Sequence, residues 1–436
     1  MAPFGRVVVV GLGYIGLPTA ATIANANIDT VGVDVNPEIV QRVNAGQCHI
    51  IEAGLGDLVA RVVRNQRLRA STQIEQADAF IVTVPTPFQE GHVPDLSYVD
   101  AAIQAIAPAI DKGNLVILES TSPVGTTRHV AEQLAALRPD LSFPQQAEEQ
   151  ADIQVAHCPE RVIPGQTLRE LIQNDRIIGG LSPRCARRAA ALYRCFVTGR
   201  CLLTDADTAE LAKLAENAFR DVNIAFANEL SLLCDRLGID VWELIRLTNC
   251  HPRVNVLQPG PGVGGHCIAV DPWFIVHTAP EQSQLIRTAR AINDAKPHWV
   301  VEQVLRAARR YEHPVIACLG LSYKPDIDDL RESPAMEIVA HLARSGVGRI
   351  LAVEPHVESL PQSLADLPVT LESLAAAAAQ ADVLVALVNH RAFAALALDR
   401  LAGKCLLDFC GAWQNRTRAV PEQELRLAGQ GRSIPA

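Results

Sequence analysis

Short apolar runs rich in β-branched residues alternate with Ala- and Leu-rich segments through the first third of the chain. The runs have the length and composition of strands, whereas the intervening segments have helical periodicity. Strands that alternate with helices predict a parallel, doubly wound sheet. The predicted strands are Arg6–Val10, Thr30–Asp34, Ala79–Val84, Leu115–Glu119 and Ile153–Cys158.

The pattern changes between about Asp205 and Ala308, where long helical periods follow one another without a convincing strand. After a break at Glu312-His313-Pro314, strands and helices alternate again. The later strands are predicted at Val315–Leu319, Arg349–Val353, Asp382–Val388 and Cys405–Asp408, with helices at Pro334–Arg344 and Leu371–Gln380. We therefore predict an α/β protein with two Rossmann-like doubly wound parallel-sheet domains, residues 1–204 and 309–436, joined by a central helical domain, residues 205–308.

Length, composition and charge agree with this plan and exclude several classes of protein. A chain of 436 residues exceeds a single core, and 49% apolar with 20% charged residues is typical of a globular protein. A net charge of -9 without a long basic run argues against nucleic acid, and no charge-free stretch is long enough to span a membrane. Eleven cysteines without a CxxC pair, and a start that resembles a strand rather than a signal peptide, predict a cytoplasmic protein.

A glycine motif follows the first predicted strand and opens a helix. In Gly11-Leu-Gly-Tyr-Ile-Gly16, Gly11 permits a tight turn, Gly13 lets the backbone approach a pyrophosphate, and Gly16 lets the helix pack closely on the sheet. Asp34 ends the next strand, where a carboxylate can bind the adenosine ribose and repel a 2′-phosphate. The motif predicts a dinucleotide site that prefers NAD over NADP. The alternative is a structural glycine turn followed by an exposed strand-end Asp.

Thr86 and Thr121 lie in two further loops that follow predicted strands. Open α/β sheets bind ligands at the carboxyl ends of their strands, so both threonines are candidate cofactor contacts. Threonine and proline are also favoured in ordinary turns. The loops alone do not decide between these interpretations.

The densest chemical signal is the glycine-rich run that precedes Cys267. Its glycines are Gly260, Gly262, Gly264 and Gly265. Such a run loses much conformational entropy when it becomes ordered, and its glycines let the backbone approach a ligand closely. A buried structural cysteine needs no such loop, so the run favours Cys267 as a nucleophile. A metal site built from Cys250, His251, His266 and Cys267 is the rival interpretation, but no CxxC or HxxxH spacing supports it, and we predict no metal.

Three polar residues recur on one face of a helix that is predicted to begin near Thr208. Lys213, Asn217 and Arg220 are spaced at i, i+4 and i+7 in a segment otherwise rich in Ala and Leu. A solvated stripe is the ordinary interpretation of such a pattern. This face lacks the Glu/Lys alternation of a surface helix, which indicates that it lines a polar cleft.

These motifs together resemble the UDP-glucose/GDP-mannose dehydrogenase family over nearly the whole chain. The resemblance implies an NAD-binding domain, a helical domain that forms a homodimer, and a C-terminal domain for the UDP moiety. The His251-Pro-Arg253 segment and the loop His266-Cys267-Ile-Ala-Val270 are similar to the branch that oxidises UDP-N-acetylmannosamine. The matching segments are Gly11–Pro18, Glu119–Gly125, Cys158–Pro164, Asn174–Gly180, Lys213–Leu230, His251–Ile275 and Leu321–Pro334.

The resemblance also implies roles for single residues. Cys267 would be the nucleophile, Lys213 a general acid/base, Asp271 and Asn217 would place water, and Glu160 would supply a further carboxylate near the reacting carbon. Substrate contacts would come, besides Lys213 and Asn217, from Arg161, Val162, Arg220, His251, Arg253, Gly264, Tyr323 and Lys324. NAD contacts would come from Tyr14 and Ile15, besides Gly11, Gly13, Gly16, Asp34, Thr86 and Thr121, with Arg331 approaching the cofactor. Cys410 departs from the family, which commonly has a basic residue there.

The implied reaction is a four-electron oxidation of C6 of a UDP-hexose to the carboxylate, through a thiohemiacetal and a thioester of Cys267, for bacterial surface polysaccharide synthesis. UDP-glucose and UDP-N-acetylglucosamine are the alternative substrates. Two other functions compete with it: a two-electron dehydrogenase of the hydroxyacid type, and a non-catalytic NAD-binding sensor. The presence of Cys267, Lys213, Asn217 and Asp271 together argues against both.

Overall fold

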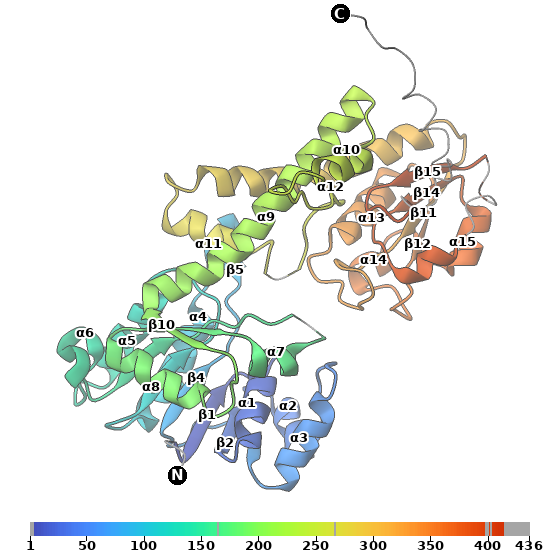
Figure 1. The fold of residues 1–436 in the computed structure, drawn as a ribbon. Helices are drawn as coiled ribbons and strands as arrows, with labels where there is room; N and C mark the ends of the chain where they lie inside the picture. The colour runs from blue at the N-terminus through green and yellow to red at the C-terminus, as the bar shows by residue number, and fades with distance from the viewer. Residues whose placement is uncertain (1–3, 164, 266, 397–400, 402, 414–436) are drawn as a thin grey trace, which may run out of the picture. The chain divides into compact units, whose positions relative to one another are not determined.

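The structure is a computed structural model that describes residues 4–163, 165–265, 267–396, 401 and 403–413 (Figure 1). It divides into two compact units. The first consists of Met1–Ala218 and Val270–Gln284, and the second of Phe219–Ala269 and Leu285–Ala436. Helix α9 (Ala206–Leu237) belongs to both, because the boundary falls inside it.

An eight-stranded sheet is the centre of the first unit, in the order β10-β9-β8-β7-β4-β1-β2-β3. Neighbouring strands are parallel except β8 and β9, which pair antiparallel. Strand order reverses between β1 and β4, the position at which doubly wound sheets bind ligands. The strands are β1 (Arg6–Val10), β2 (Asp29–Val33), β3 (Leu68–Ser71), β4 (Ala79–Val82), β7 (Leu115–Leu118), β8 (Gln154–His157), β9 (Arg176–Gly180) and β10 (Cys201–Asp205). A separate short hairpin pairs β5 (Phe88–Gln89) with β6 (Val93–Pro94).

Helices cover both faces of this sheet and bury two apolar clusters against it. Figure 1 shows α1, α2 and α3 beside strands β1 and β2. The apolar residues of α3 lie on one stripe, which packs inward, while its arginines and Asp57 face solvent. The helices are α1 (Gly16–Asn25), α2 (Pro37–Asn44), α3 (Leu55–Arg64), α4 (Ser97–Ile106), α5 (Thr126–Leu137), α6 (Pro144–Ala147), α7 (Thr167–Gln173), α8 (Pro183–Tyr193) and α11 (Asp271–Thr278).

Helices account for the secondary structure of the described residues from 206 to 308, as predicted. Besides α9 and α11, they are α10 (Val241–Thr248) and α12 (Gln284–Ala308). In the second unit a fully buried polar network joins α9 to α12: Arg290 donates to Asp221 over 2.6 Å, and Asn293 bonds both Asp221 and Asn228. None of the helices in the described part of the chain is long and apolar enough to cross a membrane.

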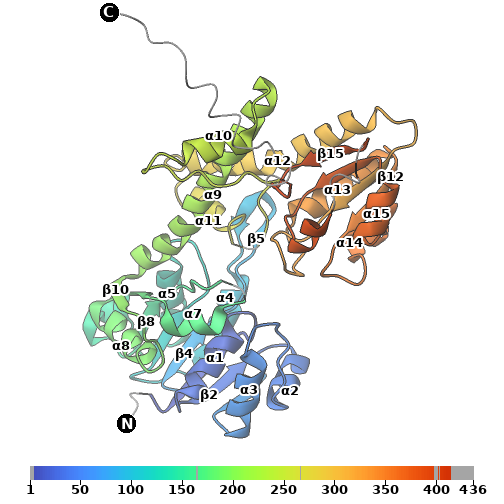
Figure 2. The same ribbon diagram turned by 45° about the vertical axis from the view of Figure 1, so that its right-hand side comes forward.

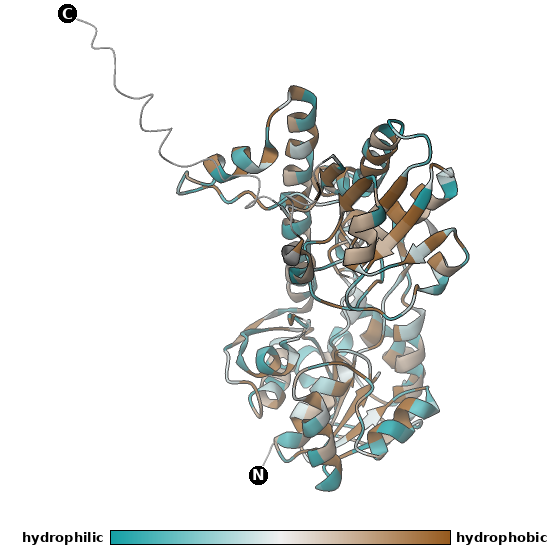
Figure 3. Cartoon of the chain, turned by 90° about the vertical axis from the view of Figure 1, so that its right-hand side faces the viewer, coloured by the Kyte–Doolittle hydropathy of each residue, from teal (hydrophilic) through white to brown (hydrophobic). Residues whose placement is uncertain are grey.

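A five-stranded parallel sheet completes the second unit, in the order β13-β12-β11-β14-β15. Figure 2 shows α13, α14 and α15 around it, and Figure 3 shows its strands among the most hydrophobic segments of the chain. The strands are β11 (Val315–Leu319), β12 (Arg349–Val353), β13 (Val369–Leu371), β14 (Val383–Ala386) and β15 (Cys405–Asp408). The helices are α13 (Pro334–Ser345), α14 (Gln362–Ala365) and α15 (Leu374–Gln380).

The two sheets repeat the same local geometry where their first strands end. Gly11 after β1 has a φ of +93°, and Gly320 after β11 has a φ of +95°. Each donates its N–H to the last carbonyl of the neighbouring strand, Val33 at 2.7 Å and Val353 at 2.8 Å. The prediction of two Rossmann-like sheets is therefore confirmed, with five of the nine strand predictions shifted or shortened by one or a few residues at their ends.

Candidate active site

The glycine motif forms a tight cradle at the switch point of the first sheet. A Cβ on Gly11 would lie 2.9 Å from the carbonyl oxygen of Thr83, and one on Gly16 only 1.8 Å from that of Gly11. Gly13 has open space on the side where a Cβ would project. Two glycines are therefore required by close packing and the third leaves the loop accessible, which fits a bound pyrophosphate at the start of α1.

Asp34 holds this loop from the end of β2. Its carboxylate accepts the amide N–H of Leu12 at 2.9 Å and that of Asn36 at 2.9 Å. The Asn36 side chain caps α2 by accepting from Glu38, so its polar group has a structural partner. Tyr14 is exposed and Ile15 half-buried on the same loop.

Thr86 and Thr121 meet, as expected for two loops at the same edge of the sheet. The Thr86 hydroxyl donates to the carbonyl of Thr121, and the Ser120 hydroxyl donates to the carbonyl of Val84 at 2.7 Å. The loops that follow β4 and β7 are thereby tied together beside the glycine cradle of β1.

Lys213, Asn217 and Asp271 come together within the first unit, from α9 and the first residue of α11. The Asn217 amide donates to the Asp271 carboxylate at 2.5 Å. Burial raises the pKa of Asp271 to about 6, although the charge of Lys213 and the bond from Asn217 act in the opposite direction. A carboxyl group with this pKa exchanges protons readily near neutral pH.

A cavity of about 390 Å³ opens beside these residues. Four of the predicted site residues line it: Arg161, Val162, Lys213 and Asn217. Ile163, Asn174, Asp175 and Glu216 complete the lining. Lys213 and Asn217 of the predicted polar face of α9 therefore line a cleft in the first unit, whereas Arg220, the third residue of that face, is not among its lining residues. Glu216 adds a residue that the sequence did not single out.

Glu216 and Arg176 are partners that sequence reasoning missed. Glu216 pairs with the Arg161 guanidinium, with an Nε to Oε2 distance of 2.9 Å. Arg176, which is 3% exposed, donates to the carboxylate of Glu160, which is 7% exposed, at 2.9 Å. Glu160 also accepts the amide of Arg161 at 2.6 Å, so its carboxylate is fixed beside a residue that lines the cleft. Glu216 lies three residues after Lys213, and this helical spacing could have indicated that both line the same cleft. Arg176 had no such signal, because it opens β9, a strand that was not predicted.

Cys267 belongs to the second unit, where its residue is exposed and outside any disulfide. The glycine run ahead of it packs on Tyr323: a Cβ on Gly264 would lie 2.9 Å from the Tyr323 Cβ, and one on Gly265 2.9 Å from its ring. Two predicted substrate residues, Gly264 and Tyr323, are thus neighbours. His266 lies outside the described residues.

The remaining predicted residues also lie in the second unit. Arg220, His251, Arg253 and Lys324 are exposed. Arg331 bonds Asp329 through two nitrogens, at 2.8 and 2.7 Å. Where the family commonly has a basic residue, burial raises the pKa of the Cys410 thiol well above its usual value, and Asp408 accepts the Cys410 amide.

Three family models match consecutive parts of the chain. They describe the NAD binding domain of the UDP-glucose/GDP-mannose dehydrogenase family at residues 5–197, its central domain at 207–295 and its UDP binding domain at 317–415. The chain belongs to the UDP-glucose/GDP-mannose dehydrogenase family. The glycine cradle of the first sheet accordingly lies in its NAD-binding domain, and the Gly320 turn of the second sheet in its UDP-binding domain.

Relatives of known name match the chain over nearly its whole length. An NDP-N-acetyl-D-galactosaminuronic acid dehydrogenase of Ralstonia nicotianae is 58% identical over 96% of this chain and 98% of its own. A UDP-N-acetyl-D-mannosamine dehydrogenase of Salmonella typhi is 56% identical over 94% of this chain and 100% of its own. The solved structure of a UDP-D-ManNAc dehydrogenase from Pyrococcus horikoshii has a TM-score of 0.84 and 39% identity, covering 93% of this chain and 96% of that one.

Proposed function

We propose that this family member oxidises C6 of UDP-N-acetyl-D-mannosamine to the carboxylate, with two NAD⁺ reduced for each molecule of product. The observation that carries the proposal is the cleft of about 390 Å³, in which Lys213, Asn217 and Arg161 gather next to Asp271. It supplies cations for an anionic substrate and a carboxyl group with a raised pKa for proton transfer. Cys267, on its glycine-rich loop, supplies the nucleophile that a second oxidation requires.

In the first step, the C6 alcohol loses its hydroxyl proton while hydride leaves C6, and an aldehyde forms. NAD⁺ supplies the hydride acceptor in both oxidations. Lys213 is half-buried beside Asp271 and can stabilise negative charge on O6 as the proton leaves. The proton passes to water held in the cleft by Asp271, whose carboxylate is kept in place by Asn217.

In the second step, the Cys267 thiolate adds to the aldehyde carbon, so a C–S bond forms and O6 takes a proton. Loss of a second hydride and of that proton gives the thioester. Water then adds to C6 as Asp271 accepts its proton, the C–S bond breaks, and the thiolate is restored with release of the carboxylate. In this scheme Glu160, fixed by Arg176, supplies a further carboxylate next to Arg161 of the cleft.

The identity of the sugar has two candidates. The Salmonella relative and the Pyrococcus structure favour N-acetylmannosamine, and the slightly more similar Ralstonia relative favours the N-acetylgalactosamine nucleotide. Purified protein should be incubated with NAD⁺ and a panel of UDP- and GDP-sugars, with kcat/KM measured for each. We expect the highest value for UDP-N-acetylmannosamine and a far lower one for UDP-glucose. Preference for the galactosamine nucleotide would change the substrate and leave the mechanism intact, whereas no turnover of any sugar would favour an NAD-binding sensor.

We also propose that the enzyme is a homodimer that associates through α9. In the second unit, Phe219, Phe226, Leu233 and Leu237 recur at intervals of seven and four residues and are between 50% and 72% exposed. An exposed apolar stripe of this kind is typical of an interface between helices. Sedimentation should give a dimer for the wild type and a monomer for Phe226→Glu. Leu285→Glu changes a leucine on α12 that is 69% exposed, against 53% for Phe226, and should remain a dimer.

We further propose that the three domains end near residues 204 and 308 and that the enzyme works in the cytoplasm. The family models, which cover 5–197, 207–295 and 317–415, support the first proposal. The eleven cysteines, all outside disulfides, support a reducing compartment. Limited proteolysis at the two boundaries and fractionation of cells that express the protein would test these assignments.

A further inference from the structure

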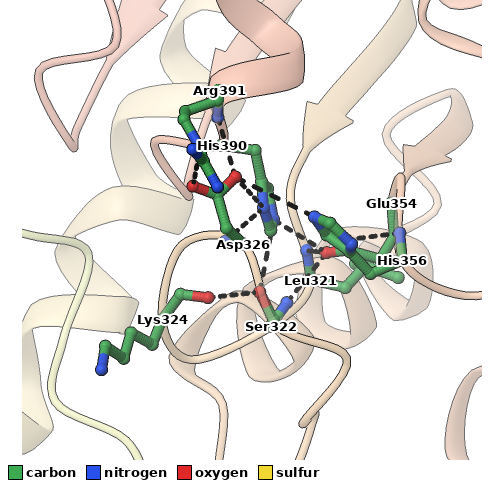
Figure 4. A network of polar contacts seen from close by, with 8 residues as sticks. All are labelled: Leu321, Ser322, Lys324, Asp326, Glu354, His356, His390 and Arg391. Atoms are coloured by element: carbon green, nitrogen blue, oxygen red, sulfur yellow. Dashed lines mark hydrogen bonds and ion pairs between the residues drawn. The ribbon is translucent and has the colours of Figure 1, made fainter. Parts of the chain in front are cut away.

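His390 is fully buried at the edge of the second sheet where the strands end. It follows β14, while Glu354 follows β12 and Ser322 lies in the loop after β11. Figure 4 shows the three side chains converging from these segments. The His390 Nε2 lies 3.1 Å from a Glu354 carboxylate oxygen and 3.2 Å from the Ser322 hydroxyl. Strand order reverses between β11 and β14, so this cluster occupies the position at which such sheets bind ligands.

The bonds around the ring assign its tautomer. Nδ1 accepts the backbone N–H of Asp326 at 3.0 Å and therefore carries no proton. Nε2 then carries the proton and donates it toward Glu354 and Ser322. Burial raises the pKa of Glu354, but the bonds from His390 and from the amides of Leu321 and Ser322 outweigh it and leave the pKa below its usual value. The result is a neutral ring beside a buried, fully bonded carboxylate.

This arrangement holds the loop from Leu321 to Asp326 at both ends. At its start, the Ser322 hydroxyl donates to the carbonyl of Lys324 at 2.8 Å while it accepts from His390. At its end, Asp326 has a φ of +60°, a strained conformation for a residue other than glycine. Its amide is held by His390 and its carboxylate by Arg391 at 2.7 Å. Between these anchors, Lys324 is exposed and Figure 4 shows its ammonium pointing away from the cluster.

We propose that His390 is a positioning residue for nucleotide binding, because it fixes the loop that presents Lys324 to the diphosphate of the substrate. The proposal rests on the proposed function and on the match of residues 317–415 to the family's UDP binding domain. A strained residue persists only where the surrounding structure determines it, and His390 provides one of the bonds that do so for Asp326. Loss of that bond lets the loop relax, and Lys324 then no longer has a single orientation toward the phosphates.

His390, His356 and Asp326 also have ligand atoms within 4.8 Å of one another, as a metal site requires. The Nδ1 lone pair of His390 is occupied by the Asp326 amide, and the Asp326 carboxylate is paired with Arg391. These bonds favour the positioning role over a metal site.

Three substitutions separate the bonds made by the two ring nitrogens. His390→Asn places an oxygen near the Nδ1 position and can keep the bond from Asp326, whereas His390→Gln places an amide nitrogen near Nε2 and can keep the bond to Glu354. His390→Phe keeps the volume and loses both. Leu364→Ala is the matched control, since Leu364 is buried in the same sheet domain on α14 and its loss destabilises the domain without removing a bond to the loop. UDP and NAD⁺ affinities should be measured by calorimetry, together with KM, kcat and melting temperature.

We expect His390→Phe to weaken UDP binding roughly tenfold, the loss of about one or two hydrogen bonds. The KM for the UDP-sugar should rise in parallel, with kcat within about twofold because binding of substrate and transition state weaken alike. The Asn and Gln variants should recover part of the affinity, and NAD⁺ binding should not change. Wild-type affinity for UDP in all three variants, or an equal loss in Leu364→Ala at the same melting temperature, would overturn the positioning role. Failure of the wild type itself to bind UDP would instead count against the proposed function.

Discussion

Asn217 on α9 donates a hydrogen bond to Asp271, the first residue of α11, over 2.5 Å. Asp271 is 3% exposed, and burial raises its pKa to about 6 against the opposing effects of Lys213 and Asn217. At neutral pH the carboxylate is therefore ionised in a poorly hydrated site. Such a group destabilises the fold, and this cost is explained by a role in proton transfer.

Asp271→Asn should stabilise the folded enzyme at neutral pH. The folded pKa of about 6 lies above the ordinary 3.8, so the folded state binds more protons in this window and wild-type stability falls as the pH rises from about 4 to about 6. The variant lacks this loss. Its advantage should grow over the same window to about 3 kcal/mol, since one pH unit of pKa difference corresponds to about 1.4 kcal/mol. Urea unfolding of both proteins at several pH values measures the difference.

Wild type and Asp271→Asn must be compared with each other because other buried carboxyl groups titrate in a similar pH range. Burial raises the pKa of Glu210 to about 7, and its contribution cancels only in the difference between wild type and variant. The same Asp271→Asn protein should form carboxylate far more slowly. If the two proteins had the same free energy of unfolding from pH 4 to 8, to within experimental error, ionisation of Asp271 would not destabilise the folded enzyme.

Asp34→Ala should weaken NAD binding more than NADP binding. The carboxylate can bond the adenosine ribose and repels a 2′-phosphate, so its removal takes away both effects. We expect at least a roughly tenfold rise in the NAD dissociation constant, the loss of one charge-assisted bond, with a smaller rise for NADP.

Asn36→Ala is the control for Asp34, because it removes only the side-chain cap of α2. Fluorescence titration with each cofactor gives the two constants. The same factor of loss for NAD and NADP in Asp34→Ala would restrict Asp34 to holding the amide of Leu12.

Much of the fold could be predicted because buried parallel strands form continuous apolar runs. Arg6–Val10, Val315–Leu319 and Arg349–Val353 have the predicted bounds. Two of the strands that were missed lack this signal: Cys201–Asp205 is half to fully exposed, and Leu68–Ser71 alternates buried and half-buried positions. Their pairing with a neighbouring strand, which no local pattern records, makes them part of the sheet.

The candidate site was predictable where function depends on glycine spacing or helical period. Gly11 and Gly16 are required by clashes that only glycine avoids, and Lys213 and Asn217 share one face of α9. Arg176 and His390 were not found, because their partners lie 16 and 36 residues away and the bonds arise only when separate strands align.

Arg176→Met should strongly destabilise the first unit. Its guanidinium and the Glu160 carboxylate are both almost fully buried and bond at 2.9 Å. Removing one partner leaves a buried charge without compensation, which typically costs about 3–5 kcal/mol. The double variant Arg176→Met with Glu160→Gln should be more stable than Arg176→Met alone, as measured by chemical unfolding. Additive effects of the two changes would mean that the ion pair is not energetically coupled.

Cys267→Ser should stall the reaction at the aldehyde level. The proposed mechanism carries both oxidations through one sulfur, so the wild type should release two NADH for each carboxylate. A serine hydroxyl is a far weaker nucleophile at neutral pH without a dedicated base. The variant should bind NAD⁺ normally but should not reduce it at an appreciable rate when UDP-sugar aldehyde is added. NADH absorbance and product analysis measure the stoichiometry.

Cys250→Ser provides the matched control for this claim. Cys250 is another exposed cysteine of the second unit, and its thiol contacts the backbone carbonyl of Arg246. If general thiol chemistry explained a loss of activity, both variants would lose it, whereas covalent catalysis predicts that Cys250→Ser keeps the two-to-one ratio and near wild-type rate. A Cys267→Ser or Cys267→Ala enzyme that still forms carboxylate near the wild-type rate would exclude the thioester. Direct oxidation of an aldehyde hydrate would then replace it, with Asp271 and Lys213 activating water from the start.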